Sequence, residues 1–151
     1  MEDFQPSNPD YAEQVRESFA RQAFMGHIGA ELVAISPGVC EIHLPHRPEL
    51  TQQHGFFHGG VIGALADTAG GYAGYALAPA GSTVLTVEYK LNFVAPGAGE
   101  RLIARGRVIR AGRTLTVTRA EVSALEDGDE TLCATALQTL MIQTNRADGP
   151  R

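Results

Sequence analysis

The hydrophobic pattern divides the chain into a short helical segment, a long apolar segment in the middle, and several alternating segments around them. The middle segment covers residues 52–78, and from His58 onward it consists almost entirely of Gly, Ala, Val, Ile and Leu. This run is too long for a strand, so it predicts a helix. Because apolar and small residues occupy every face, the helix is expected at the centre of the fold.

Several glycines interrupt this predicted central helix, and each costs about 1 kcal/mol of helix propensity relative to Ala. They are Gly59, Gly60, Gly63, Gly70, Gly71 and Gly74. A helix that tolerates them needs other backbone close against it. We therefore expect a sheet wrapped around the helix, which ends near Ala78, before a Pro-Ala-Gly turn.

The N-terminal segment predicts an amphipathic helix that packs on the sheet, because apolar residues recur at helical spacing from Tyr11 to Ala23. Asn8 is the expected N-cap, with Pro9 at the first helical position, and Gly26 is the expected C-terminal cap. Residues 1–7 are predicted to form a flexible arm.

Alternating apolar and polar residues predict the strands. Residues 31–35 and 39–44 flank a Ser-Pro-Gly turn and form a hairpin. Four further strands are expected at 83–94, 101–109, 115–125 and 131–143, all antiparallel. In the first of these, one face is predicted to carry Leu85, Val87, Tyr89, Leu91 and Phe93, and the opposite face Thr86, Glu88, Lys90 and Asn92. The fold class is therefore α+β, with the helices on one face of the sheet.

Length and composition fit one domain, expected at residues 8–143, with a flexible tail at 144–151. The net charge of −5 argues against non-specific nucleic-acid binding. Cys40 and Cys133 lie in strand-like segments and are expected to be buried free thiols, which fits a reducing cytosol. The chain opens with no signal-peptide pattern, and the central helix has Asp67 at its middle, so a cytoplasmic protein that does not enter the membrane is predicted.

Asp67 has no Lys or Arg within one helical turn on either side. A buried carboxylate is costly unless it is paired or hydrogen-bonded, so either local hydroxyls such as Thr68 satisfy it or it has a function. The helix start at Gly59-Gly60 leaves backbone N–H groups open at a positive helix end, which suits an oxyanion or a polarised carbonyl.

The motif formed by Gly55, His58-Gly59-Gly60 and Leu65-x-Asp67 resembles the signature of hotdog-fold acyl-CoA thioesterases of the phenylacetyl-CoA thioesterase (PaaI-like) family. One position departs from that signature, since Gln52 stands where the family has Asn; its amide offers the same donor and acceptor on a longer arm. The resemblance implies a hotdog fold, hydrolysis of acyl-CoA thioesters, and dimers, often paired into tetramers, with composite active sites.

Helix geometry leads independently to a composite site. Gly59 and Asp67 are eight residues apart, which corresponds to about 12 Å along one helix. A thioester carbonyl and the water that attacks it lie within about 3.5 Å. If both groups are catalytic, Gly59 of one subunit must act with Asp67 of another, as in a two-fold dimer with antiparallel central helices.

The predicted roles follow from this arrangement. The Gly59 N–H polarises the thioester carbonyl, Gln52 orients the carbonyl or the water, and Asp67 acts as general base or as nucleophile. Thr86 matches the family position that holds the water, although an ordinary strand threonine is an equal interpretation. His58 is interpreted as a neutral group that shapes the pocket.

Binding of CoA is assigned through the resemblance, which points to the turn that contains Arg110, Gly112, Arg113 and Thr114. Gly60, at the helix start, is also predicted to contact the substrate or CoA. Arg pairs with phosphate in a bidentate manner, and a solvated basic hairpin is the alternative. No cofactor is expected beyond CoA as part of the substrate. The histidines match no metal-ligand spacing, so no metal is expected.

Two other functions stay open. A hydratase acting on enoyl thioesters is disfavoured because the Asp-x-Asn-Pro-x-His pattern is absent from the sequence. A non-catalytic hotdog module that binds acyl-CoA is disfavoured by the presence of Asp67, while the Gln52 departure is compatible with it. The acyl group, the choice between base and nucleophile, and the choice between dimer and tetramer are left open.

Overall fold

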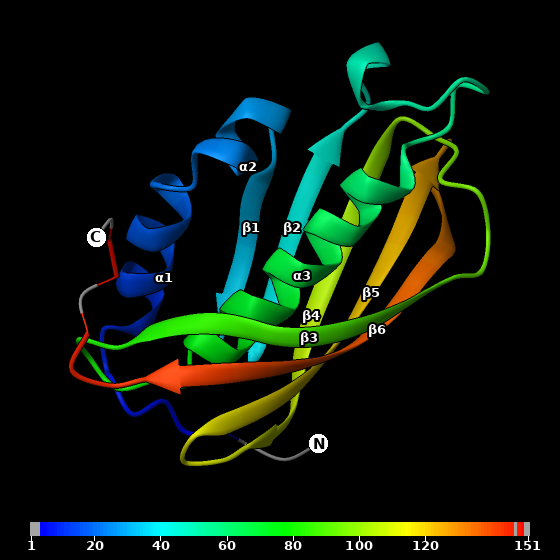
Figure 1. Ribbon diagram of the computed structural model, residues 1–151. Coiled ribbons are helices and arrows are strands. Elements are labelled where there is room, and N and C mark those ends of the chain that lie inside the picture. Colours follow the sequence, from blue (N-terminus) through cyan, green and yellow to red (C-terminus); the bar gives the residue numbers. More distant parts are fainter. Residues whose placement is uncertain (1–3, 147, 150–151) are drawn as a thin grey trace.

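The computed structural model describes residues 4–146 and 148–149 and shows a curved antiparallel sheet around one long helix (Figure 1). The sheet has six strands in the order β1-β2-β4-β5-β6-β3. The hotdog fold predicted from the sequence is therefore confirmed. The strands are β1 (Glu31–Ser36), β2 (Val39–Pro45), β3 (Thr83–Phe93), β4 (Arg101–Ala111), β5 (Leu115–Glu126) and β6 (Asp129–Gln143). The helices are α1 (Tyr11–Ala20), α2 (Ala23–Ile28), the short 3-10 helix η1 (Pro48–Leu50) and α3 (Gly59–Tyr75).

The central helix α3 begins one residue after His58, whose side chain accepts a hydrogen bond from the Gly60 N–H. Most of its residues are buried, as expected for a helix with no polar face. Its last helical residue is Tyr75, three residues before the predicted end near Ala78.

The predicted N-terminal helix is two helices. The chain leaves α1 after Ala20 and begins α2 at Ala23, so Gly26 lies inside α2 and the prediction of a cap there is wrong. The C-cap is Gly29, which has a φ of 79° in the left-handed region that favours glycine. Asn8 accepts a hydrogen bond from the Asp10 N–H, so it stabilises the turn before α1 although the N-cap position belongs to Asp10.

Strand β3 contains an irregularity between Thr86 and Glu88 that corrects the predicted faces. Paired residues of an antiparallel ladder share a face. Thr86, Tyr89, Leu91 and Phe93 pair with the buried β6 residues Leu140, Gln138, Ala136 and Ala134. Thr86 therefore shares the helix-facing side with Tyr89, Leu91 and Phe93, whereas the sequence placed it on the opposite side.

Where α3 crosses β4, the backbone of the helix lies in close contact with the backbone of the strand. A Cβ atom built on Gly106 would lie 2.1 Å from the Ala69 carbonyl oxygen and 2.7 Å from the Gly70 nitrogen. Only glycine fits there, which confirms that backbone lies close against this glycine-containing helix.

Both cysteines are buried and free, as predicted. Burial and the neighbouring charge of Glu41 raise the pKa of Cys40 to about 12, and burial also raises the pKa of Cys133. Neither thiol is therefore ionised near neutral pH.

None of the helices within the described ranges is long and apolar enough to cross a membrane. The predicted arm and tail fall partly on residues 1–3, 147 and 150–151, which lie outside the described residues. Within the tail, the Arg146 N–H donates to the Gly81 carbonyl at 3.0 Å.

Candidate active site

The carboxylate of Asp67 is held from the sheet rather than by an ion pair. The Thr86 hydroxyl donates to Asp67 Oδ1 at 2.7 Å, and the Gln138 amide donates to the same oxygen at 2.6 Å. The Gln138 amide also lies 3.1 Å from the Asp67 main-chain oxygen. Neutral donors on β3 and β6 thus orient a carboxylate on α3 within one subunit.

The amide that holds Asp67 is itself fixed by a second hydrogen bond. The Thr118 hydroxyl on β5 donates to Gln138 Oε1 at 3.2 Å, and both residues are almost completely buried. Because the oxygen of the amide faces Thr118, its NH₂ group faces Asp67. A buried chain of three side chains, Thr118 to Gln138 to Asp67, therefore sets the direction of the carboxylate.

Gln138 and Thr118 were not identified from the sequence. The only signal was a glutamine at an inward position of a strand whose inward neighbours, Ala136 and Leu140, are apolar. A polar residue at such a position must have a partner, because an unpaired buried amide is costly. The sequence alone does not say that the partner is Asp67.

A glycine makes room for this chain beneath the helix. A Cβ atom on Gly70 would lie 2.0 Å from Gln138 Oε1 and 2.9 Å from Thr118 Oγ1. Any other residue at position 70 would displace the Gln138 amide. Gly70 therefore allows α3 to pack on the sheet and also leaves room for the Gln138 amide that positions Asp67.

One oxygen of Asp67 stays available for chemistry. Oδ1 accepts both hydrogen bonds, while Oδ2 has no hydrogen-bond partner among the described residues. Asp67 borders a cavity of about 330 Å³ together with Thr68, Gly71 and Thr86. The carboxylate can accept a proton from a molecule in this cavity without losing the hydrogen bonds that orient it.

The N-terminus of α3 offers a second chemical feature. His58 accepts the Gly60 N–H through Nδ1 at 2.9 Å, which requires a neutral imidazole because a protonated ring has no acceptor. The Gly59 N–H has no acceptor among the described residues. It borders a cavity of about 560 Å³ with Gln52, Phe56 and other residues.

The predicted site residues fall into two separate places within one chain. Gln52 and Gly59 line one cavity, Asp67 and Thr86 line another, and no described residue lines both. The Gln52 Oε1 accepts the His54 N–H of its own loop, so its NH₂ group is the part available to a ligand. The structure therefore does not bring Gly59 and Asp67 together within one subunit.

The turn predicted to bind CoA lies at the opposite end of α3 from Gly59. Gly112 and Arg113 border a cavity of about 380 Å³ with Gly74 and Leu77. Gly112 is required by the turn itself, because its N–H donates to the Leu115 carbonyl and a Cβ atom would lie 2.6 Å from that oxygen. Arg110 is exposed near the end of β4, and Thr114 is exposed within the hairpin turn. Gly60 lies at the N-terminal end of α3, away from this hairpin. Binding of CoA at these residues stays a prediction.

A long helix wrapped by a six-stranded antiparallel sheet is the arrangement of the hotdog fold. Residues 54–131 match the Thioesterase superfamily. The chain belongs to this family.

Sequence and structure relatives agree with the assignment. A presumed esterase of Saccharolobus solfataricus is 33% identical over 129 residues, which cover 85% of this chain and 83% of the relative. The proofreading thioesterase EntH of Klebsiella pneumoniae is 26% identical over 94 residues, 62% of this chain and 69% of EntH.

Among solved structures, a thioesterase family protein of Silicibacter pomeroyi is 46% identical with a TM-score of 0.87, covering 89% of this chain and 98% of that one. The PaaI protein of Escherichia coli shares the fold, with a TM-score of 0.78 at 20% identity over 89% of this chain and 94% of PaaI. The family and these relatives support hydrolysis of a thioester.

Gln138→Leu is expected to lower kcat for thioester hydrolysis by about 10- to 100-fold, because loss of the amide donor lets the Asp67 carboxylate move by a fraction of an ångström or more. The measurement is steady-state hydrolysis together with thermal unfolding. Gln143→Leu, on the same strand, is the matched control and should retain kcat, because Gln143 contacts Met141 and Arg146 rather than Asp67. A folded Gln138→Leu variant with wild-type kcat would show that Gln138 has no part in positioning Asp67.

Proposed function

We propose that the protein hydrolyses acyl-CoA thioesters to the free acid and CoA in a dimer with two composite active sites. The observation that carries this proposal is the Asp67 carboxylate, which borders a cavity with one oxygen fixed by Thr86 and Gln138 and the other open. In each site, Asp67 of one subunit acts on a thioester whose carbonyl is polarised by the Gly59 N–H of the other subunit.

Two routes are chemically compatible with this geometry. As general base, Asp67 takes a proton from water while the water oxygen adds to the carbonyl, and the tetrahedral intermediate then expels the CoA thiolate. As nucleophile, Asp67 forms a mixed anhydride, expels the thiolate, and is released by water. In both routes the Gly59 N–H, at the positive end of α3, stabilises the negative oxygen of the intermediate.

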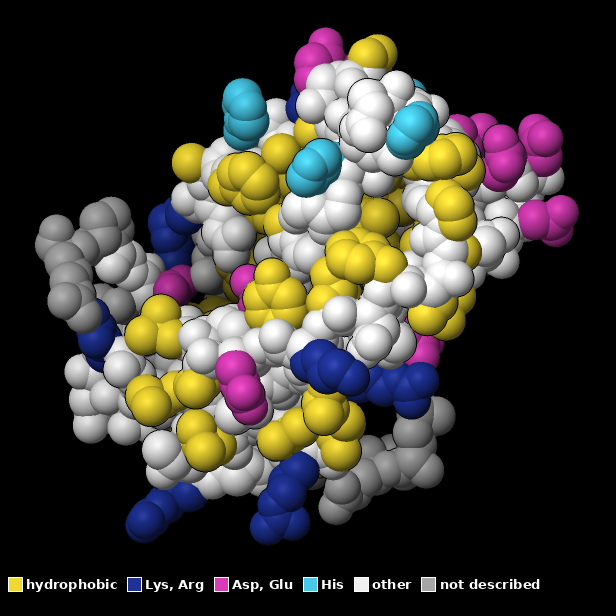
Figure 2. Space-filling model, turned by 45° about the vertical axis from the view of Figure 1, so that its right-hand side comes forward, with side chains coloured by type: hydrophobic (Ala, Val, Ile, Leu, Met, Phe, Trp, Pro, Cys, Tyr) yellow, Lys and Arg dark blue, Asp and Glu magenta, His cyan; other side chains and the backbone are white. Residues whose placement is uncertain are grey.

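The strand β3 offers a surface for the partner subunit. It lies at the edge of the sheet, and it exposes about half of each of the side chains of Leu85, Val87, Tyr89 and Phe93. An exposed apolar edge strand is a template for pairing with another chain. Figure 2 shows apolar side chains spread across the face that carries β3. Antiparallel pairing of two β3 strands about a two-fold axis would set the α3 helices side by side in opposite directions.

A two-fold arrangement also fits the predicted CoA turn. In one chain that turn lies at the C-terminal end of α3 and Gly59 at the N-terminal end. In a partner with the opposite direction, these two ends exchange places. Arg110 and Arg113 of one subunit can therefore bind the phosphates of a CoA whose thioester lies at Gly59 of another subunit, whether the assembly is a dimer or a tetramer.

A cytoplasmic location stays a prediction.

The test is complementation between two inactive variants. Gly59→Pro removes the N–H. Proline is tolerated at this position, because Gly59 is the first residue of α3 and the residue before it, His58, has an extended conformation. Asp67→Asn removes the base. Mixed dimers that carry one copy of each, isolated with two different affinity tags, should release CoA at about half the wild-type rate per dimer, because one of two sites is intact.

Gly59→Ala is the matched control, because its Cβ atom also contacts the Phe93 ring, at 3.1 Å, while the N–H is kept. Mixed dimers that stay inactive would contradict the composite site. Wild-type protein that binds acyl-CoA but releases no CoA would instead support the non-catalytic acyl-CoA-binding module.

A further inference from the structure

The hydroxyl group of Tyr89 lies against α3 between the two cavities that border Gly59 and Asp67. Tyr89 is on the helix-facing side of β3, and a Cβ atom built on Gly63 would lie 3.5 Å from its hydroxyl oxygen. The hydroxyl has no hydrogen-bond partner among the described residues, and 45% of the Tyr89 surface is exposed. A phenol whose O–H group is free therefore stands beside the helix that carries Asp67.

The spacing along α3 puts this hydroxyl on the same face of the helix as the carboxylate. Gly59, Gly63 and Asp67 follow one another at intervals of four residues. Each interval corresponds to about 6 Å along the helix axis and about 40° around it, so the three residues share one face. This face must meet the partner subunit if Gly59 and Asp67 of two subunits form one site.

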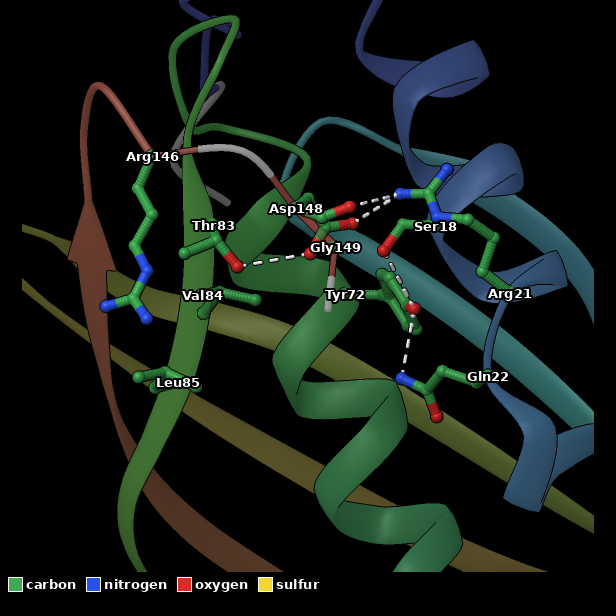
Figure 3. A pocket seen from close by; sticks show the side chains of 10 residues that line it. All are labelled: Ser18, Arg21, Gln22, Tyr72, Thr83, Val84, Leu85, Arg146, Asp148 and Gly149. Atoms are coloured by element: carbon green, nitrogen blue, oxygen red, sulfur yellow. Dashed lines mark hydrogen bonds and ion pairs between the residues drawn. The ribbon is translucent and has the colours of Figure 1, made fainter. Parts of the chain in front are cut away.

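Another group of polar side chains near Asp67 faces helix α1 instead (Figure 3). Tyr72 follows Asp67 by five residues, which turns it about 140° around α3. The Gln22 amide donates to the Tyr72 hydroxyl at 3.0 Å, and the Tyr72 and Ser18 hydroxyls lie 3.2 Å apart. These groups hydrogen-bond to one another on the side of α1, whereas the Tyr89 hydroxyl is free on the side of the partner subunit.

The gap between Tyr89 and Asp67 has the length of one bridging water molecule. Side chains four residues apart on a helix have Cβ atoms about 6 Å apart, and a water with two hydrogen bonds of about 2.8 Å each spans a similar distance. Asp67 Oδ2 has no hydrogen-bond partner among the described residues, since Thr86 and Gln138 both donate to Oδ1. Both ends of such a bridge are therefore free in one chain.

Resting on the proposed thioesterase function, we infer that Tyr89 is a further catalytic residue, which holds the reacting water together with Asp67. The water directs one proton to Asp67 Oδ2 and its other O–H group to the Tyr89 oxygen. With both protons held, a lone pair of the water points at the thioester carbonyl. As the new C–O bond forms, Asp67 takes the first proton. The C–S bond then breaks and its electron pair leaves with the CoA thiolate, while Tyr89 keeps its own proton.

The proposed dimer shields this water from solvent. Gly63 is midway between Gly59 and Asp67 in α3. In an antiparallel pair of helices with Gly59 opposite Asp67 of the partner subunit, the two Gly63 residues therefore stand opposite each other. Each Tyr89 hydroxyl then lies near the two-fold axis, and the partner subunit covers the exposed part of the ring. Hydrogen bonds to a water held there are stronger than in bulk solvent.

The test removes the hydroxyl and keeps the ring. Tyr89→Phe should lower kcat for acyl-CoA hydrolysis by about tenfold, because one hydrogen bond to the reacting water is lost. Affinity for acyl-CoA should not change, and calorimetry on Asp67→Asn with and without Tyr89→Phe measures it in the absence of turnover. Thermal unfolding and sedimentation show whether the variant keeps the fold and the dimer.

Tyr75→Phe is the matched control. It removes a phenol of α3 that is buried and donates to the Ser82 carbonyl at 3.0 Å, away from the Asp67 cavity. This variant should keep the wild-type kcat, so a loss in Tyr89→Phe alone assigns the effect to the hydroxyl at Gly63.

A catalytic role and a merely structural role differ in the Asp67→Asn background. In that variant no carboxylate takes a proton from the water, so Tyr89→Phe should change the remaining rate by less than about twofold. A structural role of Tyr89 would instead lower the remaining rate by the same factor as in the wild type.

A folded, dimeric Tyr89→Phe variant with wild-type kcat would overturn the inference and leave the proposed thioesterase function intact. A tenfold loss that persists in the Asp67→Asn background, or a loss of affinity at unchanged kcat, would also overturn it. Wild-type protein that releases no CoA from any acyl-CoA would overturn the proposed function, and the inference with it.

Discussion

Asp67→Asn is expected to lower kcat for acyl-CoA hydrolysis by about 10³-fold or more, since an amide can act neither as general base nor as nucleophile. Asn keeps an oxygen that can accept from Thr86 and Gln138, so the side chain should stay in place and the affinity for acyl-CoA should survive. The measurement is release of free CoA from a panel of acyl-CoAs, with binding followed by calorimetry.

The control for this substitution is Glu88→Gln, which removes a carboxylate from β3 that accepts a hydrogen bond from Thr139 on the outer face of the sheet. It should leave kcat unchanged, because Glu88 does not border the Asp67 cavity. If Asp67→Asn turns over at the wild-type rate, the assignment of Asp67 is wrong, and His58 becomes the next residue to test.

Gly106→Ala is expected to lower the free energy of unfolding by more than about 3 kcal/mol or to prevent folding. The added methyl group would overlap the Ala69 carbonyl oxygen at 2.1 Å, and this atom belongs to the backbone of α3, so no side-chain rotation can relieve the overlap. Chemical unfolding monitored by circular dichroism measures the loss, with soluble yield as a second readout.

Gly26→Ala is the matched control, since a Cβ atom at that position in α2 meets no atom within 4 Å. A glycine inside a helix costs about 1 kcal/mol relative to Ala, so this change should be neutral or stabilising. Equal stabilities of the two variants would mean that α3 does not contact β4 at the backbone of Gly106.

The sequence was sufficient for the elements whose hydrophobic pattern is long and regular. The apolar run after His58 defined α3, and the alternation in 115–125 and 131–143 defined β5 and β6 almost to the residue. The prediction was wrong where one or two residues interrupt the hydrophobic periodicity. The irregularity at Val87 reverses the faces of β3, and the break at Arg21 and Gln22 divides the predicted N-terminal helix without a proline or glycine to mark it.

The candidate site was only partly predictable for a related reason. Asp67 and Gly59 stand out locally, one as a charge in an apolar helix and the other at a helix start. Gln138 is 71 residues away from Asp67, and their contact depends on the pairing of β3 with β6 and on how α3 rests on the sheet. Such a contact is a property of the assembled fold, and periodicity along the chain carries no information about it.

The packing of Gln138 beneath Gly70 has a consequence for how the family can vary. A side chain at position 70 and a long amide at position 138 cannot occupy the same space, and Thr118 has its acceptor only while that amide is present. Positions 70, 118 and 138 should therefore change together among relatives. A relative with a larger residue at position 70 should carry a shorter one at position 138, and its carboxylate would then need a donor from another strand.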